Sequence, residues 1–347
     1  VSAKSCELAA VQELYQAIYQ DDICFAVFFC SSKYDLAKLE VALNKVFKGV
    51  NLIGCTTAGE LTPEGMNDGA ITGFSICSEE FIAQSITLDM ATVESKESMA
   101  QLKSLEERVE SLAGEGFESL SWLLINSMYS TVERGLGVVD SCFNSIPIVG
   151  GSPGGGDDFK AGFVYSDGRF HEDAVVVSYI STSLPFEVFK IDDFDELPER
   201  VVLTEVDITK RLVKGIDGMS AVEGYLAAVG AQSSELDALF YAAHPLAAKV
   251  AGDLYVRAIT PPLTNMGITH EQGSLQFFCA VEEGMILSAV KTKEPIQHFN
   301  RKFVELNETN GAAQLVLACD CIYRKFNYRQ AGVEKAINET MVNNNVM

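Results

Sequence analysis

The sequence lacks the features that would place it at a membrane or on nucleic acid. No apolar run approaches the ~20 residues that a membrane-spanning helix needs, so we expect no membrane partner. Basic residues are scarce, with 26 Lys and Arg against 48 Asp and Glu and a net charge of −22. A field of that sign repels phosphate groups, which excludes nucleic acid and anionic lipid as partners. The acidity is typical of a protein kept soluble in the cytoplasm, and a docking face for a basic partner is the alternative.

Metal-binding and disulfide patterns are also missing. None of the nine cysteines forms a C-x-x-C pair, and most lie in apolar, strand-like runs, where a free thiol packs as a small hydrophobe. Their odd number and irregular spacing are typical of a reduced, cytoplasmic chain. The four histidines show no H-E-x-x-H or other ligand spacing; they are His171, His244, His270 and His298. The sequence therefore predicts no zinc ribbon, thioredoxin-like site or multi-histidine metal centre.

What is present is a duplicated pattern of strands and helices in the first half of the chain. A buried strand, an amphipathic helix and a second strand that breaks into glycines occur once before residue 60 and again between residues 121 and 151. The separation in sequence from Phe25 to Gly54 equals that from Trp122 to Gly151. Each passage predicts two parallel strands joined by a right-handed crossover.

The duplication indicates the fold class. We expect internal repeats at about 21–90 and 118–180, forming an α+β (mixed α/β) fold. In it, duplicated strand-helix-strand units build two mixed sheets that are flanked by helices and packed face to face. Residues 1–198 are the expected N-terminal domain with its linker, and residues 199–347 are a second α+β domain at the C-terminus.

Three local patterns make narrower predictions. Residues 70–77 and 81–90 are expected to pair with each other as a meander. Asp167-Gly168 is a strong signal for the turn of a hairpin. In the second domain, the apolar run at 312–319 predicts a strand before a C-terminal helix.

Two glycine-rich loops follow the second strand of each repeat, VNLIGCTTAGEL at 50–61 and IPIVGGSPGGGD at 146–157. The second fits G-x-S-x-G around Ser152, the pattern of a nucleophile elbow. Pro153 lacks the N–H that an oxyanion hole would use, and Pro-Gly-Gly-Gly stands where a helix should follow. Neither loop has the lysine of a phosphate loop, and Asp157-Asp158 would repel a pyrophosphate. We therefore expect that the chain is not an enzyme. The rejected alternative is an enzyme that uses Ser152 or a cysteine as its nucleophile.

The loops remain candidates for ligand binding. Because they occupy matching points of a duplicated unit, we expect them to lie close together, at strand ends where open sheets bind ligands. The alternative is that their glycines only allow turns at the ends of the sheets. The candidate ligand-binding residues are Cys55, Thr56, Thr57, Gly151, Ser152, Gly154 and Gly155.

Several segments resemble the FIST family, the F-box and intracellular signal transduction sensory proteins. In the first half these are IGCTTAGEL (53–61) with GAITGFSI (69–76), and IPIVGGSPGGGDDF (146–159) with its following hairpin. In the second half they are VKGIDGMSAVEGYLAAVG, HPLAAKVAGDLYVRAI, GSLQFFCAVEEGM and AAQLVLACDCIYRKF. The resemblance runs in order through most of the chain.

The resemblance implies ligand sensing instead of catalysis. With no kinase, cyclase or F-box segment in the sequence, the chain is similar to the stand-alone bacterial branch described as nitric-oxide-sensing haem proteins, which regulate a partner histidine kinase. It thus implies haem b as cofactor, nitric oxide as ligand and a cytoplasmic two-component system. The alternative is a FIST module that binds a non-haem metabolite, such as an amino acid, at the glycine loops. The sequence leaves open whether the chain is a homo-oligomer.

A haem site needs an axial ligand and partners for the propionates. His244 is the leading candidate for the iron ligand, because it follows an apolar helix and precedes a strand, where its ring can face a cavity. Arg257 is the candidate propionate partner. A Cys, Met or Tyr near a strand end is the alternative ligand, and a hydrogen-bonded core role is the alternative for His244.

Overall fold

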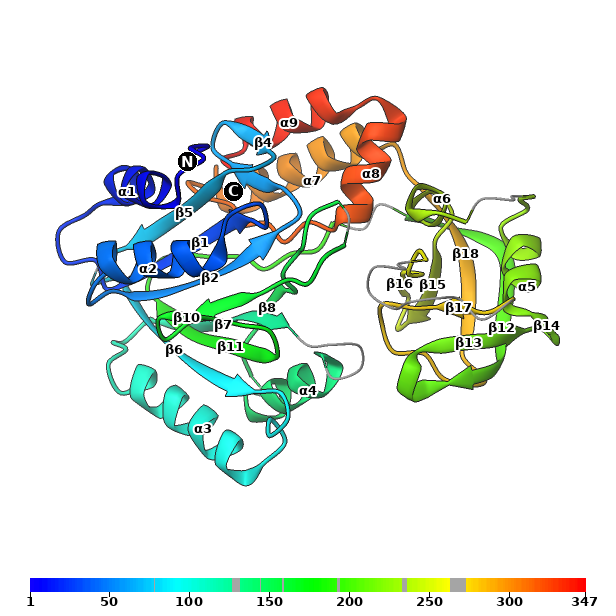
Figure 1. Ribbon diagram of the computed structural model, residues 1–347, viewed down its shortest axis with the longest axis horizontal. Coiled ribbons are helices and arrows are strands. Elements are labelled where there is room, and N and C mark those ends of the chain that lie inside the picture. The colour runs from blue at the N-terminus through cyan, green and yellow to red at the C-terminus, as the bar shows by residue number, and fades with distance from the viewer. Residues whose placement is uncertain are drawn as a thin grey trace. The chain divides into compact units, whose positions relative to one another are not determined.

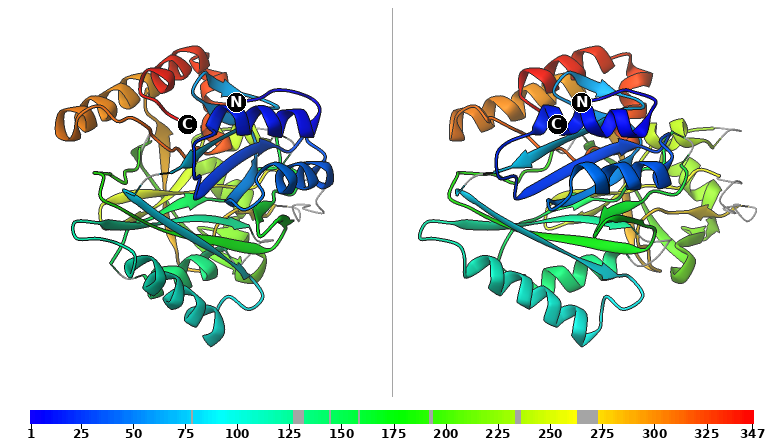
Figure 2. Two further views of the ribbon diagram at one scale, coloured as in Figure 1. Left: turned by 90° about the vertical axis from the view of Figure 1, so that its left-hand side faces the viewer. Right: turned by 60° about the vertical axis from the view of Figure 1, so that its left-hand side comes forward.

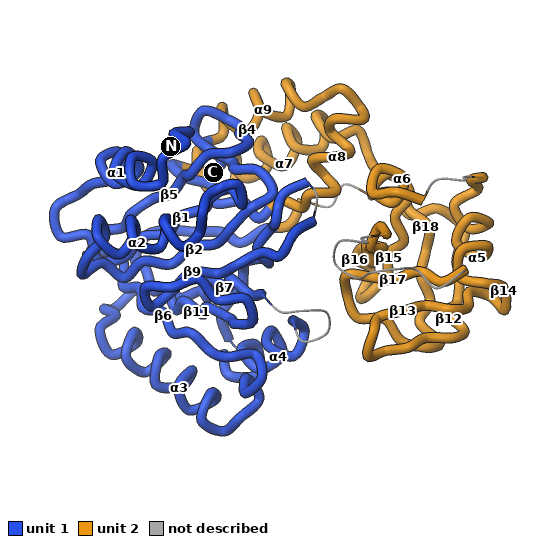
Figure 3. The backbone as a smooth tube through the Cα atoms, viewed as in Figure 1, with its two compact units in different colours: residues 1–189, 314–319, 345–347 blue, residues 190–313, 320–344 orange. Residues whose placement is uncertain are grey.

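The computed structural model describes residues 1–77, 79–126, 132–143, 145–157, 159–191, 194–232, 236–262 and 273–347. The chain divides into two compact units, which Figure 3 colours separately. Unit 1 comprises Val1–Phe189, Gln314–Cys319 and Asn345–Met347, and unit 2 comprises Lys190–Ala313 and Asp320–Asn344. The domain boundary after residue 198 stays a prediction, whereas this structural division comes at Lys190.

The first sheet of unit 1 has the strand order β10-β9-β2-β1-β5. Its strands are β1 (Phe25–Ser31), β2 (Asn51–Thr57), β5 (Ile71–Ile76), β9 (Val164–Ser166) and β10 (Arg169–His171). β1 and β2 are parallel and are joined through α2 (Leu36–Val46), whereas β5 is antiparallel to β1. α1 (Glu7–Ile18) and α2 cover the outer face of this sheet, where Leu14, Leu39 and Leu43 are fully buried.

The second sheet of unit 1 repeats this plan in the order β6-β11-β7-β8. Its strands are β6 (Phe81–Asp89), β7 (Glu118–Asn126), β8 (Ile148–Gly151) and β11 (Ala174–Thr182). β7 and β8 are parallel and α4 (Val132–Cys142) lies between them in sequence, while β11 is antiparallel to β7. α3 (Lys96–Glu110) and α4 cover the outer face through buried residues such as Leu105 and Val139.

The inner faces of the two sheets pack on each other. Val27 and Ile53 of the first sheet share one core cluster with Leu124 and Val176 of the second. Figures 1 and 2 show the resulting layers of unit 1, with α1 and α2 outside one sheet and α3 and α4 outside the other. The predicted fold class, two packed mixed sheets flanked by helices, is therefore confirmed.

The two repeats exchange strands. β6 comes from the first repeat but pairs with β11 of the second along its whole length, from Phe81–Thr182 to Asp89–Ala174. In return, β9 of the second repeat pairs with β2 of the first. The predicted meander of residues 70–77 and 81–90 is wrong, because β5 pairs with β1 and β6 lies in the other sheet. The physical reason is that all nine residues of β11 are buried, and such a central strand needs partners on both edges.

The predicted hairpin turn at Asp167-Gly168 is confirmed. It joins β9 to β10, and its two residues have φ angles of 49° and 78°. Two consecutive positive φ angles are the geometry of a type I′ turn, which explains the Asp-Gly pair. A second small hairpin, β3 (Glu60–Thr62) with β4 (Gly65–Asn67), follows β2.

Unit 2 is a second α+β unit, built on a sheet in the order β14-β13-β12-β18-β15-β16, with β17 paired to β13. The strands are β12 (Phe194–Asp207), β13 (Leu212–Ile216), β14 (Met219–Ser220), β15 (Leu246–Val250), β16 (Asp253–Arg257), β17 (Leu275–Gln276) and β18 (Ile286–Thr292). The helices are the 3₁₀ turn η1 (Ile208–Lys210) and α5 (Ala221–Ala228), α6 (Ala238–Ala243), α7 (Pro295–Asn310), α8 (Ile322–Ala331) and α9 (Glu334–Asn343). Across the residues that the structure describes, no helix has both the length and the apolar character needed to cross a membrane.

The predicted strand at 312–319 is wrong. Residues 311–315 are exposed, and the stretch makes a single bridge, in which Val316 pairs in parallel with Val346. The Val316 N–H donates to Asn345 O and the Met347 N–H donates to Val316 O. A strand needs a partner of similar length, and the partner here consists of only residues 345–347.

Candidate functional site

The two glycine-rich loops meet in unit 1. The Gly154 N–H donates a hydrogen bond of 2.9 Å to the carbonyl oxygen of Thr56, at the end of β2. A Cβ atom added to Gly154 would lie 2.6 Å from Ala58 N, so only glycine lets the two segments approach this closely. The predicted proximity of the loops is confirmed.

Thr56 joins these loops to β9. Its N–H donates to Phe163 O at 2.9 Å, and its hydroxyl accepts from the Phe163 N–H at 2.9 Å. Thr56 is fully buried, and its N–H, carbonyl and hydroxyl are all engaged within the chain. This arrangement gives Thr56 a structural role, and its contact with a ligand stays a prediction.

The other loop residues differ in exposure. Ser152 is exposed, and residues 153–157 after it are not helical, so the geometry of a nucleophile elbow is not formed there. Gly151 ends β8 beside Cys319, and Gly155 is buried against the carbonyl of Lys160. Cys55 is buried between the sheets, and burial raises the pKa of its thiol, which disfavours the thiolate that a nucleophile needs. Asp158 lies outside the described residues.

Glu60 is a buried acid that the sequence reasoning missed. Its side chain is 1% exposed, and its Oε1 lies 2.6 Å from the Thr57 hydroxyl. Its Oε2 accepts from the N–H groups of Gly69 and Ala70 at 3.0 and 2.8 Å. Burial raises the pKa of Glu60 in spite of these hydrogen bonds. The available signal was an acid placed directly after a glycine turn, at the start of a short strand.

His244 lies in unit 2 as the residue that ends α6. Its Nδ1 is 3.0 Å from Phe240 O, and its ring stacks on that of Phe240 with centroids 4.4 Å apart. The Tyr225 hydroxyl of α5 donates to His244 O at 2.7 Å. The half-buried imidazole is therefore held by Phe240 of α6, and the backbone of His244 is held by Tyr225 of α5.

The contact with Phe240 also determines the tautomer of His244. A carbonyl oxygen only accepts, so Nδ1 carries a proton, and in the neutral ring Nε2 is the nitrogen with a free lone pair. Histidines that bind metals almost always donate their other N–H to a carbonyl or carboxylate in this way. The donor chemistry of His244 thus fits an axial ligand of haem iron.

Arg257, the second predicted haem residue, lies on β16, which neighbours the strand that follows His244. Across β15 and β16, Arg257 is paired with Leu246, and Leu246 lies two residues after His244 in the sequence. Its buried Nε has no hydrogen-bond partner among the residues that the structure describes. An unpaired guanidinium N–H is suited to an anionic group such as a propionate.

The remaining histidines are less suited than His244 to bind a metal. His171 ends β10 with Nε2 at 3.2 Å from Ser166 O, and His298 of α7 has Nδ1 at 2.9 Å from an Arg301 nitrogen. His270 lies outside the described residues. Within the described part of the chain, no three His, Cys, Asp or Glu side chains gather as a metal site.

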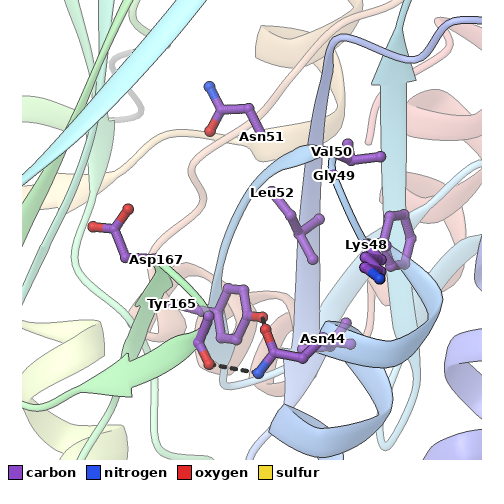
Figure 4. Close-up of a pocket in the computed structure, with 11 residues that line it drawn as sticks. Asn44, Lys48, Gly49, Val50, Asn51, Leu52, Tyr165 and Asp167 are labelled. Carbon is purple, nitrogen blue, oxygen red and sulfur yellow. Dashed lines mark hydrogen bonds between the residues drawn. The ribbon is translucent and has the colours of Figure 1, made fainter.

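A polar hollow of about 320 Å³ opens in unit 1 beside the loop between α2 and β2. Figure 4 shows its floor, where the Tyr165 hydroxyl donates to Asn44 Oδ1, and Asn44 Nδ2 donates to Gly168 O. Lys48 and Asp167 also line it, and the Asp167 carboxylate accepts from the Thr87 hydroxyl at 2.8 Å. It borders Asn51 at the start of β2, roughly 20 Å along the strand from Thr57. The glycine loops therefore lie at the opposite end of β2 from this hollow.

Comparison with known proteins identifies the family to which the chain is similar. The family model of the FIST N domain matches residues 24–219, and that of the FIST C domain matches residues 221–346. No curated protein matches the chain. Among solved structures, the RNA-binding domain of threonyl-tRNA synthetase from Cryptosporidium parvum Iowa II aligns with 52% of this chain and 54% of that chain, at 11% identity and a TM-score of 0.18. The chain spans about half the length of that structure, and so weak a likeness supports no conclusion.

Proposed function

This chain belongs to the FIST family, and from that premise we propose that it is a haem-based sensor of nitric oxide that regulates a partner histidine kinase. Membership of the family indicates a sensory role in signal transduction. The haem cofactor, the nitric oxide ligand and the histidine kinase partner are proposed in addition to that sensory role. They rest on the similarity to the stand-alone branch and on the geometry of one histidine.

The observation that supports haem is the hydrogen bond from His244 Nδ1 to Phe240 O. It places a proton on Nδ1, so in the neutral form of the ring Nε2 is the nitrogen free to bind a metal. Bound haem b would supply an iron atom able to bind nitric oxide, and His244 is the residue proposed to hold that iron. Arg257, whose buried Nε has no hydrogen-bond partner among the described residues, is the residue proposed to hold a propionate.

The surroundings of His244 suggest how a change at its ring would spread. Its carbonyl is bonded to Tyr225 of α5, and Leu246, two residues on, begins β15. A shift of His244 therefore acts directly on a helix and on the central sheet of unit 2. We propose that this movement alters a surface recognised by the kinase, with the protein acting in the cytoplasm by association and not as an enzyme.

Absorption spectroscopy tests the haem proposal. The purified protein mixed with ferrous haem should give a Soret band distinct from that of free haem, and this band should shift when nitric oxide is added. His244→Ala should lose the ferrous spectrum of a histidine-ligated haem, whereas His298→Ala, which changes a half-buried histidine of α7 that is bonded to Arg301, should retain it. A spectrum that stays that of free haem after the protein is added rules out the haem sensor. A band unchanged in His244→Ala rules out His244 as the ligand.

A second candidate function, the sensing of an amino acid or similar metabolite, is favoured by the hollow beside α2. Lys48 and Asp167 place opposite charges at its rim, as a zwitterion requires. Calorimetric titration of the haem-free protein with a panel of amino acids should then show binding that Lys48→Met and Asp167→Asn each weaken. Lys38→Met, which removes a surface lysine of α2 outside the hollow, is the control. Binding that survives both hollow variants rejects this site.

A further inference from the structure

Within the described residues, three buried side chains of unit 1 each have a polar atom without a hydrogen-bond partner. They are Thr72, Trp122 and Ser178, with 0%, 4% and 0% of their surface exposed. The hydroxyl of Thr72, the indole Nε1 of Trp122 and the hydroxyl of Ser178 make no hydrogen bond to any residue that the structure describes. Buried polar groups are otherwise nearly always paired, so three unpaired atoms in one unit require an explanation.

The three side chains share one layer. In β5, Thr72 continues the face of Phe74 and Ile76, and in β11, Ser178 stands between Val176 and Ile180 on the same face. These apolar neighbours belong to the core cluster between the two sheets. Strand periodicity therefore directs the Thr72 and Ser178 hydroxyls into that layer, to which Trp122 also belongs.

Register and ring contacts place the three residues along one line of neighbours. Thr72 is paired with Phe29 across β5 and β1. The ring of Phe29 lies 6.4 Å from that of Trp122, across the gap between the sheets. Trp122 is in turn paired with Ser178 across β7 and β11. The first repeat thus contributes Thr72, and the second contributes Trp122 and Ser178.

We infer that Thr72, Trp122 and Ser178 form an enclosed binding site for one small, uncharged, hydrogen-bonding molecule between the two sheets. Trp122 Nε1 only donates, so the guest accepts there, while the two hydroxyls donate or accept. The guest is uncharged because the surrounding cluster is apolar and would leave an ion uncompensated. It is small because packed sheets lie only about 10 Å apart and side chains fill the space between them.

Water and a small alcohol or amide share this chemistry, and buried waters typically make about three hydrogen bonds of this kind. Such a guest would tie the two repeats together at the centre of unit 1. The inference does not depend on the proposed haem site, which lies in unit 2. Failure of one would leave the other standing.

The sign of a stability change tests the inference. Thr72→Val and Ser178→Ala remove the hydroxyls with little change of volume. If a guest is bound, each variant loses a hydrogen bond and its unfolding equilibrium constant in urea should rise about five- to tenfold. In the double variant, the unfolding equilibrium constant should then rise by less than the product of the two single increases, because both substitutions act on one guest. Ser121→Ala, which removes a buried hydroxyl bonded to Ser178 O, shows that the assay detects such a loss.

If the layer is dry, each variant removes a polar group that was buried without a partner. Thr72→Val and Ser178→Ala should then be as stable as the parent protein or more stable, and that result overturns the inference. A high-resolution crystal structure identifies the guest. A single peak within about 2.7–3.2 Å of the three atoms assigns water. Extended density, matched by a compound released on denaturation and detected by mass spectrometry, assigns an organic molecule, and an empty layer overturns the inference.

Discussion

The amide nitrogen of Gly154 lies 2.9 Å from the carbonyl oxygen of Thr56, and this hydrogen bond joins the two glycine-rich loops of unit 1. Thr56 is also bonded through its N–H and its hydroxyl to Phe163, just before β9. The ends of β2 and β8 and the approach to β9 are therefore held at a single joint. Because each loop comes from a different repeat, this joint connects the two halves of the duplicated unit.

Gly154→Ala should weaken that joint. The added Cβ would lie 2.6 Å from Ala58 N and 3.0 Å from Ala58 Cβ, so the two loops must separate. Overpacking of this kind typically costs about 1–3 kcal/mol, and we expect the free energy of unfolding in urea to fall by that amount. Gly154 does not have the left-handed φ that disfavours alanine, so the loss is steric.

The matched control is Gly137→Ala, in α4. Nothing lies within 4 Å of the Cβ that it adds, and its position is exposed. Alanine in a helix interior is more favourable than glycine by roughly 0.5–1 kcal/mol, so this variant should be more stable than the parent. Equal stability of the two variants would show that the close approach at Gly154 is not needed.

The sequence predicted the layers of unit 1 but not the exchange of strands between them. The strand-helix-strand passages are local patterns, and β1, α2 and β2 follow from the spacing of their apolar residues. The pairing of β6 with β11 depends on a partner far away in the sequence, because Phe81 pairs with Thr182. Apolar periodicity does not specify which sheet edge a strand joins.

The candidate site shows the same limit. The position of His244 at a helix end and the proximity of the glycine loops were predictable, since both follow from the order of elements. The buried contacts of Glu60 with Gly69 and Ala70 were not, because they depend on how the β3–β4 hairpin folds back on the chain. The unpaired atoms between the sheets could be recognised only once the register of both sheets was known.

Tyr225→Phe tests the support of His244. The Tyr225 side chain is fully buried, and its hydroxyl donates to His244 O at 2.7 Å. Its removal leaves a carbonyl without that donor, which should lower the free energy of unfolding of the haem-free protein by about 1–3 kcal/mol.

Tyr241→Phe is the matched control for this change. Tyr241 is 2% exposed and packs 5.8 Å from Tyr225, but its hydroxyl has no hydrogen-bond partner in the described part of the chain. Loss of this hydroxyl should leave stability unchanged or increase it. If the two variants are equally destabilised, the bond to His244 is not what distinguishes Tyr225.

The buried carboxyl of Glu60 should make stability depend on pH. Burial raises its pKa in the folded protein above the ordinary value of 4.5, so the folded state binds a proton more tightly than the unfolded state. The associated stability is complete below the unfolded pKa and is lost as pH rises through the folded pKa. Across that window the free energy of unfolding should fall by at most about 1.4 kcal/mol per pH unit for this one group.

Glu60→Gln isolates this effect, because the amide keeps an acceptor for Gly69 and Ala70 and a donor for Thr57, as the protonated acid does. The two proteins should be similarly stable near pH 4, and the variant should become the more stable of the two as the pH is raised to 8. Urea unfolding of both proteins at each pH measures the difference. Glu60→Ala, which removes every one of these bonds, should be less stable than Glu60→Gln at all pH values. A difference between parent and Glu60→Gln that does not change with pH would mean that Glu60 titrates normally in the folded protein.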